Sequence, residues 1–323
     1  MKKCILALLV VASVLGTRTF AQVKQAREQI MFYTSDWKGE RFPDGRPKIP
    51  DNLLKRALDV STEDIWDFLR EKGYDNQFES GWLALHSDKP FSGRALTTQY
   101  MPSRPDVAKA EAAEGKAEGR IPFGMNNSWP IAELVQGDVY VADGYGKIID
   151  GTLIGSNLGN GIAEHTHSGF VFNGGIRDEA ENREIPDFNG FYKGYDPSAW
   201  QQEELTCINC PIRIGRATVL PGDLVIADAQ GVIFVPAILV EEAISSAELT
   251  SLMDDYNFLL NKEGKNGAQF EGGWNAEKFA GFKQWVAAHP DELKMPKDEF
   301  EKLVNERMEQ MNHRQRPSGS PAP

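Results

Sequence analysis

The sequence is poor in cysteine. Only three of its 323 residues are cysteines: Cys4 in an N-terminal apolar run, and the pair Cys207 and Cys210 in "CINC". No second pair exists to complete a four-thiolate zinc site, and the strand-like "PIRI" that follows differs from the helix start typical of a redox pair. The sequence favours a small structural disulfide or an idle pair. A redox pair and half a zinc site stay open as alternatives.

Long apolar runs are lacking after the N-terminus. The one candidate, "CILALLVVASVLG", follows Lys2 and Lys3 and precedes the small-residue site "TFA" at 19–21. This order is typical of a secretory signal peptide, so we expect residues 1–21 to be cleaved off. We expect no membrane-spanning segment in the remainder. The interpretation is an exported protein of a bacterial periplasm.

Blocks of basic residues are also absent. The net charge is −12, and signal cleavage would lower it to −15 because three basic residues and no acidic residue are lost. An acidic chain without a basic stripe repels phosphate backbones, so nucleic-acid binding is not expected. The chain is 41% hydrophobic and 25% charged, which is sufficient for a sizeable core.

The pattern of apolar residues predicts a mixed α/β fold. After a polar, turn-rich lead-in over 22–54, "STEDIWDFLREKG" has helix signals, with Ser61 or Thr62 as the cap and Gly73 at the end. From residue 131 onwards, "DVYVAD", "GFVFNGG", "PIRIG", "DLVIAD" and "GVIFVP" are β-branched runs separated by turns. A short helix fits between the first two runs, and "ADAQG" predicts a hairpin. Alternating strands and helices indicate a layered α/β fold.

The C-terminal quarter differs from the rest. Residues 237–263 predict a long helix ending at Gly264, and "KDEFEKLVNERMEQM" predicts a second helix whose apolar stripe needs a partner surface. The tail "RQRPSGSPAP" predicts disorder, and the Ala/Glu/Gly-rich stretch 103–125 predicts an exposed insertion. The predicted division is a signal peptide at 1–21, a lead-in at 22–54, an α/β domain at 55–245 and a helical extension at 246–323.

"NGGIRDEAE" holds the first candidate site. Arg177 and Asp178 follow a buried-strand pattern and the pair Gly174–Gly175, whose missing side chains would allow a tight turn and close approach of a ligand. An Asp at a strand end suits a hard cation such as Mg²⁺, and an adjacent Arg suits a carboxylate. Glu181 could join through water. The alternative is a solvated Arg–Asp turn.

The segment "GSNLGNG" at 155–161 holds the second candidate site. A glycine-rich loop that opens a helix directs free backbone N–H groups at an anion. Alternatively, Ser156 and Asn157 are ordinary N-cap residues. Because one helix and one strand separate this loop from Arg177 and Asp178, a βαβ-like return could bring the two segments together.

Two further sets of polar residues are weaker candidates. "EHTHSG" offers Glu164, His165 and His167 as zinc ligands, but histidines two residues apart diverge on a helix and no third partner is suitably spaced. Asp223 in "PGD" and Asp228 in "ADAQG" are most simply turn residues. Neither set is predicted to be a site.

Several of these motifs together resemble a known family. "GDVYVADGYG", "GSNL", "GFVFNGGIRDEAE" and "RATVLPGDLVIADAQGVIFVP" occur in the order seen in RraA-like proteins, and "STEDIWDFL" and "FSGRALTTQY" are similar to the first helix and strand of that family. The family includes regulators of ribonuclease activity A, proteins formerly labelled demethylmenaquinone methyltransferases, and 4-hydroxy-4-methyl-2-oxoglutarate aldolases. The resemblance covers roughly residues 55–245.

The resemblance implies a fold, an assembly and a reaction. The implied fold is an αββα sandwich with a swivelling-domain-like core, in a homotrimer or hexamer with sites between subunits. Asp178, with Glu181, would hold Mg²⁺ or Mn²⁺, and Arg177 would contact a small-molecule 2-oxo acid. Gly155, Ser156, Asn157 and Leu158 would offer N–H groups to its carboxylate. The implied reaction is retro-aldol cleavage, or decarboxylation of oxaloacetate, through a pyruvate enolate.

Three features depart from the family pattern. Ser156 stands where the aldolases often have an acid, Tyr145 and Lys147 stand where small residues are common, and the C-terminal extension lies outside the family unit. The missing acid favours a second hypothesis. In that hypothesis the protein is a non-catalytic RraA-like module that binds an acidic ligand or supports an assembly.

Overall fold

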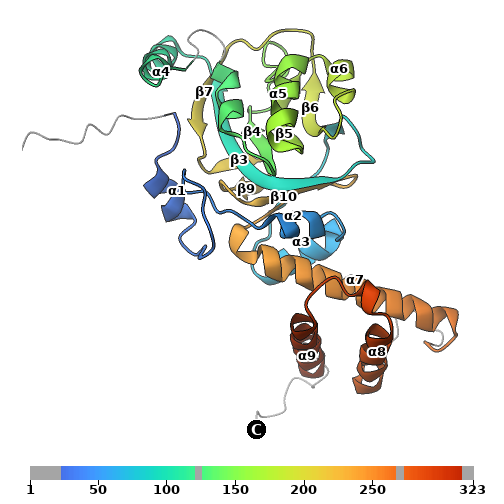
Figure 1. The fold of residues 1–323 in the computed structure, drawn as a ribbon. Coiled ribbons are helices and arrows are strands. Elements are labelled where there is room, and N and C mark those ends of the chain that lie inside the picture. Colours follow the sequence, from blue (N-terminus) through green and yellow to red (C-terminus); the bar gives the residue numbers. More distant parts are fainter. Residues whose placement is uncertain (1–22, 121–125, 267–272, 315–323) are drawn as a thin grey trace, which may run out of the picture.

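A curved sheet forms the centre of the protein (Figure 1). The computed structural model describes residues 23–120, 126–266 and 273–314, so the predicted signal peptide and C-terminal tail lie outside the described residues. The strands are β1 (Phe78–Glu79), β2 (Leu83–Ala84), β3 (Phe91–Pro102), β4 (Asp138–Asp143), β5 (Gly169–Ile176), β6 (Asn189–Tyr195), β7 (Glu203–Ile208), β8 (Ile212–Ile214), β9 (Ala217–Val219), β10 (Leu224–Asp228) and β11 (Gly231–Val235).

Helices flank the sheet and extend the C-terminus. They are α1 (Arg27–Tyr33), α2 (Asp51–Arg56), α3 (Thr62–Glu71), α4 (Pro105–Ala117), α5 (Ser156–Thr166), α6 (Glu179–Arg183), α7 (Val240–Lys262), α8 (Ala276–Ala288) and α9 (Lys297–Arg314). Short 3₁₀ turns are η1 (Asn126–Ser128), η2 (Pro130–Glu133), η3 (Ala237–Leu239) and η5 (Pro290–Glu292). The helix predicted after Ser61 is confirmed, because the Ser61 side chain accepts a hydrogen bond from Glu63 N.

The main sheet is mixed. Its strand order is β1-β11-β10-β3-β4-β5-β6-β2, with β7 pairing separately with β3. Strands β3 to β6 run parallel to one another, and the remaining neighbours are antiparallel. The β10–β11 hairpin confirms the expectation from "ADAQG". Because β3 to β6 are parallel, their carboxyl ends lie at one edge of the sheet.

Side chains alternate between two faces of the sheet, as pleating requires. On β4, Val139 and Val141 pack in an inner cluster that also holds the β8–β9 hairpin, whereas Tyr140 packs on the opposite face with Ile162 of α5. On β10, Val225 joins the same inner cluster, and the alternate residues pack against α2, α3 and α7. The curved sheet lies between α5 and α6 on one side and α2, α3 and α7 on the other, as Figure 1 shows. This arrangement confirms the predicted αββα sandwich.

The lead-in is more ordered than its polar composition predicts. Arg46 is 1% exposed, and its guanidinium forms ion pairs with Asp138 at 3.0 Å and Asp44 at 2.8 Å. Burial lowers the pKa of Arg46, but the two carboxylates outweigh this effect and raise it. A buried charge needs such partners. The lead-in is thereby attached to the first residue of β4.

The described part of the stretch 103–125 is mostly exposed, as predicted for an insertion, but one side of it contacts the sheet. Its helix α4 packs against β7, and Glu111 and Gly115 are buried. A Cβ on Gly115 would lie 2.4 Å from the Trp129 ring, so only glycine allows this approach. Residues 121–125 lie outside the described residues.

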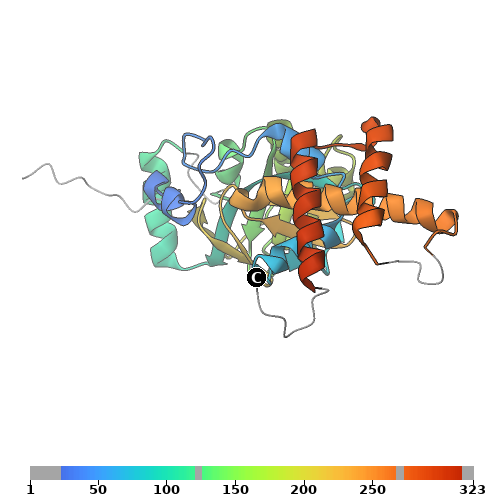
Figure 2. The ribbon, with the colours of Figure 1, turned by 90° about the horizontal axis from the view of Figure 1, so that it is seen from below.

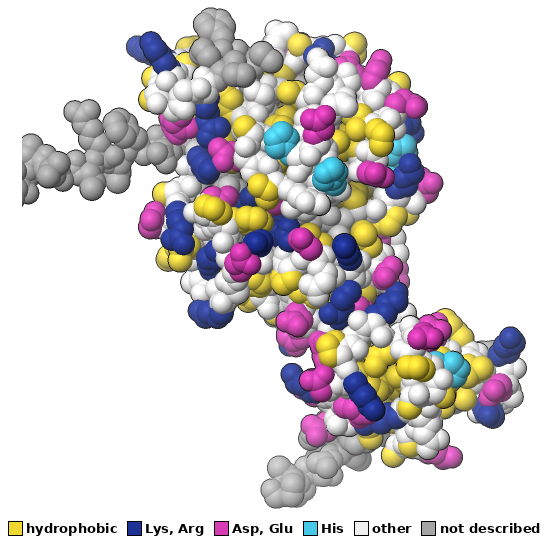
Figure 3. Space-filling view, in the orientation of Figure 1, with side chains coloured by type: hydrophobic (Ala, Val, Ile, Leu, Met, Phe, Trp, Pro, Cys, Tyr) yellow, Lys and Arg dark blue, Asp and Glu magenta, His cyan; other side chains and the backbone are white. Residues whose placement is uncertain are grey.

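The C-terminal helices form a lobe of their own around the far half of α7 (Figures 1 and 2). Leu249, Leu252 and Tyr256 of α7 form a separate apolar cluster with Phe282 of α8 and Phe300 of α9. The apolar stripes predicted on the C-terminal helices therefore find their partner surface within the same chain. Apolar side chains are also visible on the surface of this lobe in Figure 3. Within the described residues, no helix is both long and apolar enough to cross a membrane.

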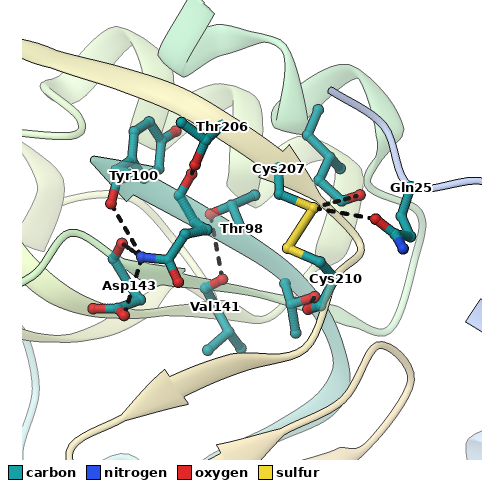
Figure 4. The surroundings of a disulfide bond; sticks show 11 residues. Gln25, Thr98, Tyr100, Val141, Asp143, Thr206, Cys207 and Cys210 are labelled. Carbon is teal, nitrogen blue, oxygen red and sulfur yellow. Dashed lines mark hydrogen bonds between the residues drawn. A yellow bond between two sulfur atoms is a disulfide. The ribbon is translucent and has the colours of Figure 1, made fainter. Parts of the chain in front are cut away.

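The cysteine pair forms a disulfide, Cys207–Cys210, at the end of β7 (Figure 4). Beside it, the N-terminal segment pairs with β7: Ile208 N donates to Val23 O and Gln25 N donates to Ile208 O, both at 2.8 Å. Of the two outcomes that the sequence favoured, a structural disulfide and an idle pair, the structure has the disulfide. It closes the turn between β7 and β8, beside the segment that contains Val23 and Gln25.

Candidate active site

Arg177 and Asp178 lie immediately beyond the carboxyl end of β5. Asp178 is the N-cap residue of α6 and has left-handed backbone angles, φ 53° and ψ 44°. Asp is one of the few residues that tolerate this region. Both side chains are half-buried. The sharp change of direction after Ile176 therefore presents an arginine and a carboxylate at the sheet edge.

Backbone pairing brings the glycine-rich loop to the same place. Leu153 N donates to Gly175 O, and Arg177 N donates to Ile154 O, both at 2.9 Å. The loop therefore runs alongside the end of β5 until α5 begins, and Ser156 N donates to Asp178 Oδ2 at 3.1 Å. The βαβ-like return predicted from the sequence is confirmed by β4, α5 and the parallel β5.

Gly155 is required by the close approach of these two segments. A Cβ at this position would lie 2.4 Å from Asp178 Oδ2 and 2.9 Å from Arg177 Nε. Gly155 is also the N-cap of α5, so the alternative reading of Ser156 and Asn157 as caps is wrong. Ser156 is the first helical residue, and the N–H groups of the next two, Asn157 and Leu158, have no intrahelical acceptor because they belong to the first turn.

Asn182 holds the Arg177–Asp178 backbone and was missed by the sequence reasoning. This fully buried side chain donates from Nδ2 to Arg177 O at 3.0 Å and to Asp178 O at 2.9 Å. Helix α5 lies so close that a Cβ on Gly159 would be 1.9 Å from Asn182 Oδ1. An asparagine four residues after the Asp, one helical turn onward, was the available signal.

The Gly174–Gly175 pair has a different role from the one predicted. Both glycines lie within β5, and their open sides face protein atoms. A Cβ on Gly175 would lie 3.0 Å from Ile148 Cα, and one on Gly174 would lie 3.4 Å from Leu153 Cδ1. The pair therefore makes room for the loop after β4 and for the segment around Thr152 and Leu153 that leads to α5.

Arg177 is available to an anion. Among the residues that the structure describes, none accepts a hydrogen bond or forms an ion pair with its guanidinium. A half-buried guanidinium with a free planar fork suits a carboxylate. The alternative, a solvated turn, would pair Arg177 with Asp178, and these two side chains do not form an ion pair. Arg177 instead stands beside the N-terminus of α5, where the macrodipole also favours negative charge.

The carboxylates fit a hydrated hard cation. Asp178 Oδ2 accepts from Ser156 N, whereas no described residue donates to Oδ1, and Glu181 is exposed on α6. Nowhere in 23–120, 126–266 and 273–314 do three or more His, Cys, Asp or Glu side chains form a group that could hold a metal ion. Mg²⁺ is commonly bound through one or two carboxylates while it keeps several waters. Asp178 has the donor chemistry for that role, and Glu181 is the second carboxylate that the sequence predicted for it.

The weaker candidates do not assemble. His165 Nδ1 lies 2.7 Å from Gly161 O on its own helix, and His167 is the left-handed C-cap of α5. Asp223 accepts from Leu220 N and Ala237 N, and Asp228 accepts from Gln230 N and Thr62 Oγ1. These two aspartates hold turns, as expected.

The loop after β4 carries Tyr145 and Lys147, which stand where small residues are common in the family. Tyr145 is 40% exposed, and Lys147 lies near the buried Glu203 at the start of β7. Burial raises the pKa of Glu203 to about 8, although Lys147 acts in the opposite direction. Glu203 was not predicted as a buried acid, because two successive glutamates usually indicate a solvated segment.

Comparison with known proteins shows which family the chain belongs to. A family model described as RraA-like, Aldolase/RraA, matches residues 62–234. The chain belongs to the RraA-like family. The matched region contains β1 to β10, β11 except for its last residue, and every residue of the candidate site, whereas α7 to α9 follow it.

Curated relatives include proteins named as aldolases. The chain is 32% identical over 127 residues to a putative 4-hydroxy-4-methyl-2-oxoglutarate aldolase of Halalkalibacterium halodurans, which covers 38% of this chain and 58% of that protein. It is 30% identical over 106 residues to the 4-hydroxy-4-methyl-2-oxoglutarate aldolase of Thermus thermophilus, covering 33% of this chain and 63% of that protein. It is 26% identical over 211 residues to protein DlpA of Legionella pneumophila, covering 63% of this chain and 31% of that protein. The chain thus spans less than two thirds of each relative.

Solved structures share the fold. RraAS2 of Streptomyces coelicolor, a member of the RNase ES inhibitor RraA protein family, superposes with a TM-score of 0.56 at 26% identity, covering 66% of this chain and 99% of that one. An uncharacterized protein of Pseudomonas syringae superposes with a TM-score of 0.55 at 21% identity, covering 72% and 97%. The second likeness concerns the fold alone.

Proposed function

We propose that the protein is a divalent-metal-dependent lyase that forms pyruvate from a 2-oxo acid, by decarboxylation of oxaloacetate or by retro-aldol cleavage. The observation that carries the proposal is the Arg177 guanidinium, which has no partner among the described residues and stands next to Asp178, itself hydrogen-bonded to the first residue of α5. Membership in a family with aldolase-named relatives supports the reaction class.

The residues of the chain supply binding and charge stabilisation. Arg177 would bind the substrate's carboxylate and 2-oxo oxygen, and the N–H groups of Asn157 and Leu158 would donate to the same carboxylate. As the bond to the leaving group breaks, its electron pair moves towards the 2-oxo oxygen, and the fixed positive charge of Arg177 stabilises the enolate that forms. Asp178, with Glu181 through water, would hold Mg²⁺ or Mn²⁺, which supplies a Lewis acid at that oxygen.

Ser156 favours decarboxylation over retro-aldol cleavage. In a retro-aldol reaction the hydroxyl on the leaving carbon must lose its proton as that carbon becomes a carbonyl, which requires a base. Ser156 is a poor base, and its Oγ lies 3.5 Å from Asp178 Oδ2. Decarboxylation of oxaloacetate needs no such base because carbon dioxide leaves directly. The enolate then takes a proton at carbon 3 to give pyruvate.

The test is pyruvate release from oxaloacetate with Mn²⁺, after subtraction of the rate that Mn²⁺ alone produces. We expect Asp178→Ala to abolish the enzymatic rate. Arg177→Lys should lower kcat/KM by about 100-fold because it keeps the charge and loses the bidentate fork. Glu164→Gln, an exposed acid on α5, is the control and should match wild type. Folded Asp178→Ala with wild-type turnover would remove the proposal.

A second candidate is a non-catalytic module that binds an acidic ligand, and Ser156 in place of the family acid is the observation that favours it. In that case oxalate with Mn²⁺ raises the melting temperature while oxaloacetate and hydroxy-oxo acids are not converted. For either candidate we propose a homotrimer or hexamer with the site between subunits, measured by light scattering, and export from the cytoplasm.

A further inference from the structure

A pocket lined by aromatic side chains lies outside the Arg177–Asp178 site and shares no residue with it. Its volume is about 400 Å³, which is within the usual range for small-molecule sites. Tyr33 at the end of α1, Trp37 in the turn that follows, and Tyr74 after α3 all line it. The β8–β9 hairpin and η3 complete its walls. The pocket is therefore formed by parts of the chain that are distant in sequence.

Exposed apolar side chains gather around this pocket. Tyr33 is 45% exposed, Tyr74 is 36% exposed and Ile238 is 43% exposed, and all three line it. Phe32, which is 69% exposed, packs edge-on against Tyr33. Large apolar side chains that are left in water at one place often mark a ligand-binding surface. The pocket thus has the apolar walls that an organic ligand needs.

The same pocket offers unpaired polar side chains. Asp36, Asn76 and Thr218 line it, and their side chains form no hydrogen bond or ion pair with any described residue. Together they provide carboxylate, amide and hydroxyl acceptors, and amide and hydroxyl donors. A ligand that carries several hydroxyl groups can use both kinds in place of water.

Hydrogen bonds hold the walls in position. Gln77 is buried, and its Nε2 donates to Thr218 O at 3.1 Å and to Phe234 O at 3.0 Å. These bonds fix the segment after α3 against β9 and β11. Arg41 Nη2 donates to Trp37 O at 3.1 Å and so fixes the turn after α1. Because the walls are already ordered, less conformational entropy is lost when a ligand binds.

The charges in the pocket disfavour an anion. Among the described residues that line it, Arg216 carries the only positive charge. The Arg216 guanidinium already lies 3.6 Å from the Glu79 carboxylate. Asp36 and Asp75 add negative charge to the lining. A neutral ligand therefore suits the pocket better than a phosphate or an acidic sugar.

The edge strand β1 beside the pocket is closed to an extended peptide. Phe78 O accepts a hydrogen bond from Arg216 Nη2 at 3.2 Å. Glu79 O accepts one from Trp82 Nε1 at 2.8 Å. A peptide that adds a strand to a sheet needs free backbone groups at the edge. The carbonyl groups of β1 are already used.

We propose that this pocket binds a neutral oligosaccharide. A sugar ring has C–H groups on its faces, which pack against aromatic rings, and hydroxyl groups at its rim, which suit Asp and Asn side chains. A quaternary ammonium ligand would use the rings but leave the donors of Asn76 and Arg216 unused. Asp75, Asn76 and Arg216 also line a neighbouring pocket of about 710 Å³. The surface therefore continues beyond one sugar unit.

The test is binding of the full chain to an array of neutral and acidic glycans, followed by calorimetry with the best neutral oligosaccharide and with choline. We expect wild type to bind neutral glycans. Tyr74→Ala removes a ring and should weaken binding by at least about tenfold. Tyr74→Phe keeps the ring and should stay within about threefold of wild type. Asn76→Ala loses hydrogen bonds and should weaken binding by about 3- to 10-fold.

Two controls separate this site from others. Phe258→Ala removes a 65% exposed ring of α7 that does not line the pocket, and it should leave binding unchanged. Asp178→Ala should abolish pyruvate formation and keep saccharide binding, whereas Tyr74→Ala should do the reverse. Weaker binding by Tyr74→Ala with a wild-type melting temperature supports the site. Binding to no neutral glycan, binding confined to acidic glycans or choline, or equal affinities of wild type and Tyr74→Ala would overturn it.

Discussion

The contact between α5 and α6 offers a quantitative test of how the candidate site is held. We predict that Asn182→Ala lowers the free energy of unfolding by about 2–4 kcal/mol, because a fully buried amide loses two hydrogen bonds and leaves a small cavity. In the mutant, Asp178 O still accepts the backbone hydrogen bond from Asn182 N at 2.9 Å. Arg177 O is therefore the carbonyl that mainly loses its hydrogen-bond donor. Urea unfolding followed by circular dichroism measures this value.

The same change should reduce activity. Arg177 and Asp178 depend on Asn182 for their backbone position, and a displacement of about 1 Å near reacting groups can lower the rate by about 100-fold. Asn52→Ala, at an exposed position on α2, is the matched control and should stay within about 0.5 kcal/mol of wild type. If Asn182→Ala equals that control in stability and keeps wild-type kcat/KM, the positioning role is wrong.

A double-mutant cycle sharpens the argument. Gly159→Ala alone should destabilise, because its Cβ would lie 1.9 Å from Asn182 Oδ1. In the Asn182→Ala background that obstruction is gone, and alanine is favoured over glycine in a helix by about 1 kcal/mol. Gly159→Ala should then be neutral or stabilising. Equal effects of Gly159→Ala in both backgrounds would contradict the proposed contact, since uncoupled changes add.

Four further changes test other parts of the molecule. Ser156→Asp restores the family acid and should raise retro-aldol turnover more than oxaloacetate decarboxylation; an unchanged ratio of the two rates would contradict that role. Replacing Cys207 and Cys210 by serine should lower the free energy of unfolding by up to about 2 kcal/mol, the value for so short a loop, and should make the melting temperature insensitive to reductant. Burial raises the pKa of Asp223 from 3.8 to about 7. Protonated Asp223 should therefore contribute its full stabilisation below about pH 4, and this stabilisation should be lost as pH rises through 7. Asp223→Asn should make the free energy of unfolding less dependent on pH between these values. Truncation after Gly264 removes α8 and α9 and exposes the apolar cluster on α7, so the product should aggregate, as size-exclusion chromatography would show.

The strands were predictable where the sequence is β-branched and regular. "DVYVAD" and "GVIFVP" give β4 and β11, whose side chains are all buried. Strands β6 and β7 were not predicted, because glycine and lysine interrupt "NGFYKGY" and two glutamates open "EELTCI". The second case shows the limit of pattern reading: Glu203 is 2% exposed, and only tertiary packing decides that.

The candidate site was predictable to the extent that it depends on local order. A strand end followed by Arg177 and Asp178, and a glycine before a helix, are visible in the sequence, and parallel strands bring them together. The purpose of each glycine was not visible. Gly174 and Gly175 leave room for Leu153 and Ile148, which lie next to the two glycines only in the folded chain. The anchoring of the lead-in through Arg46 likewise depends on Asp138, 92 positions further along the chain.

Helix α7 packs in two separate apolar clusters. Its first turns pack in the cluster beneath β10 and β11, and its later turns carry the C-terminal lobe. Twenty-three residues make a rod about 35 Å long. Rotation of the core is therefore transmitted to the lobe without an intervening hinge, and melting of the core would remove the support on which α8 and α9 rest.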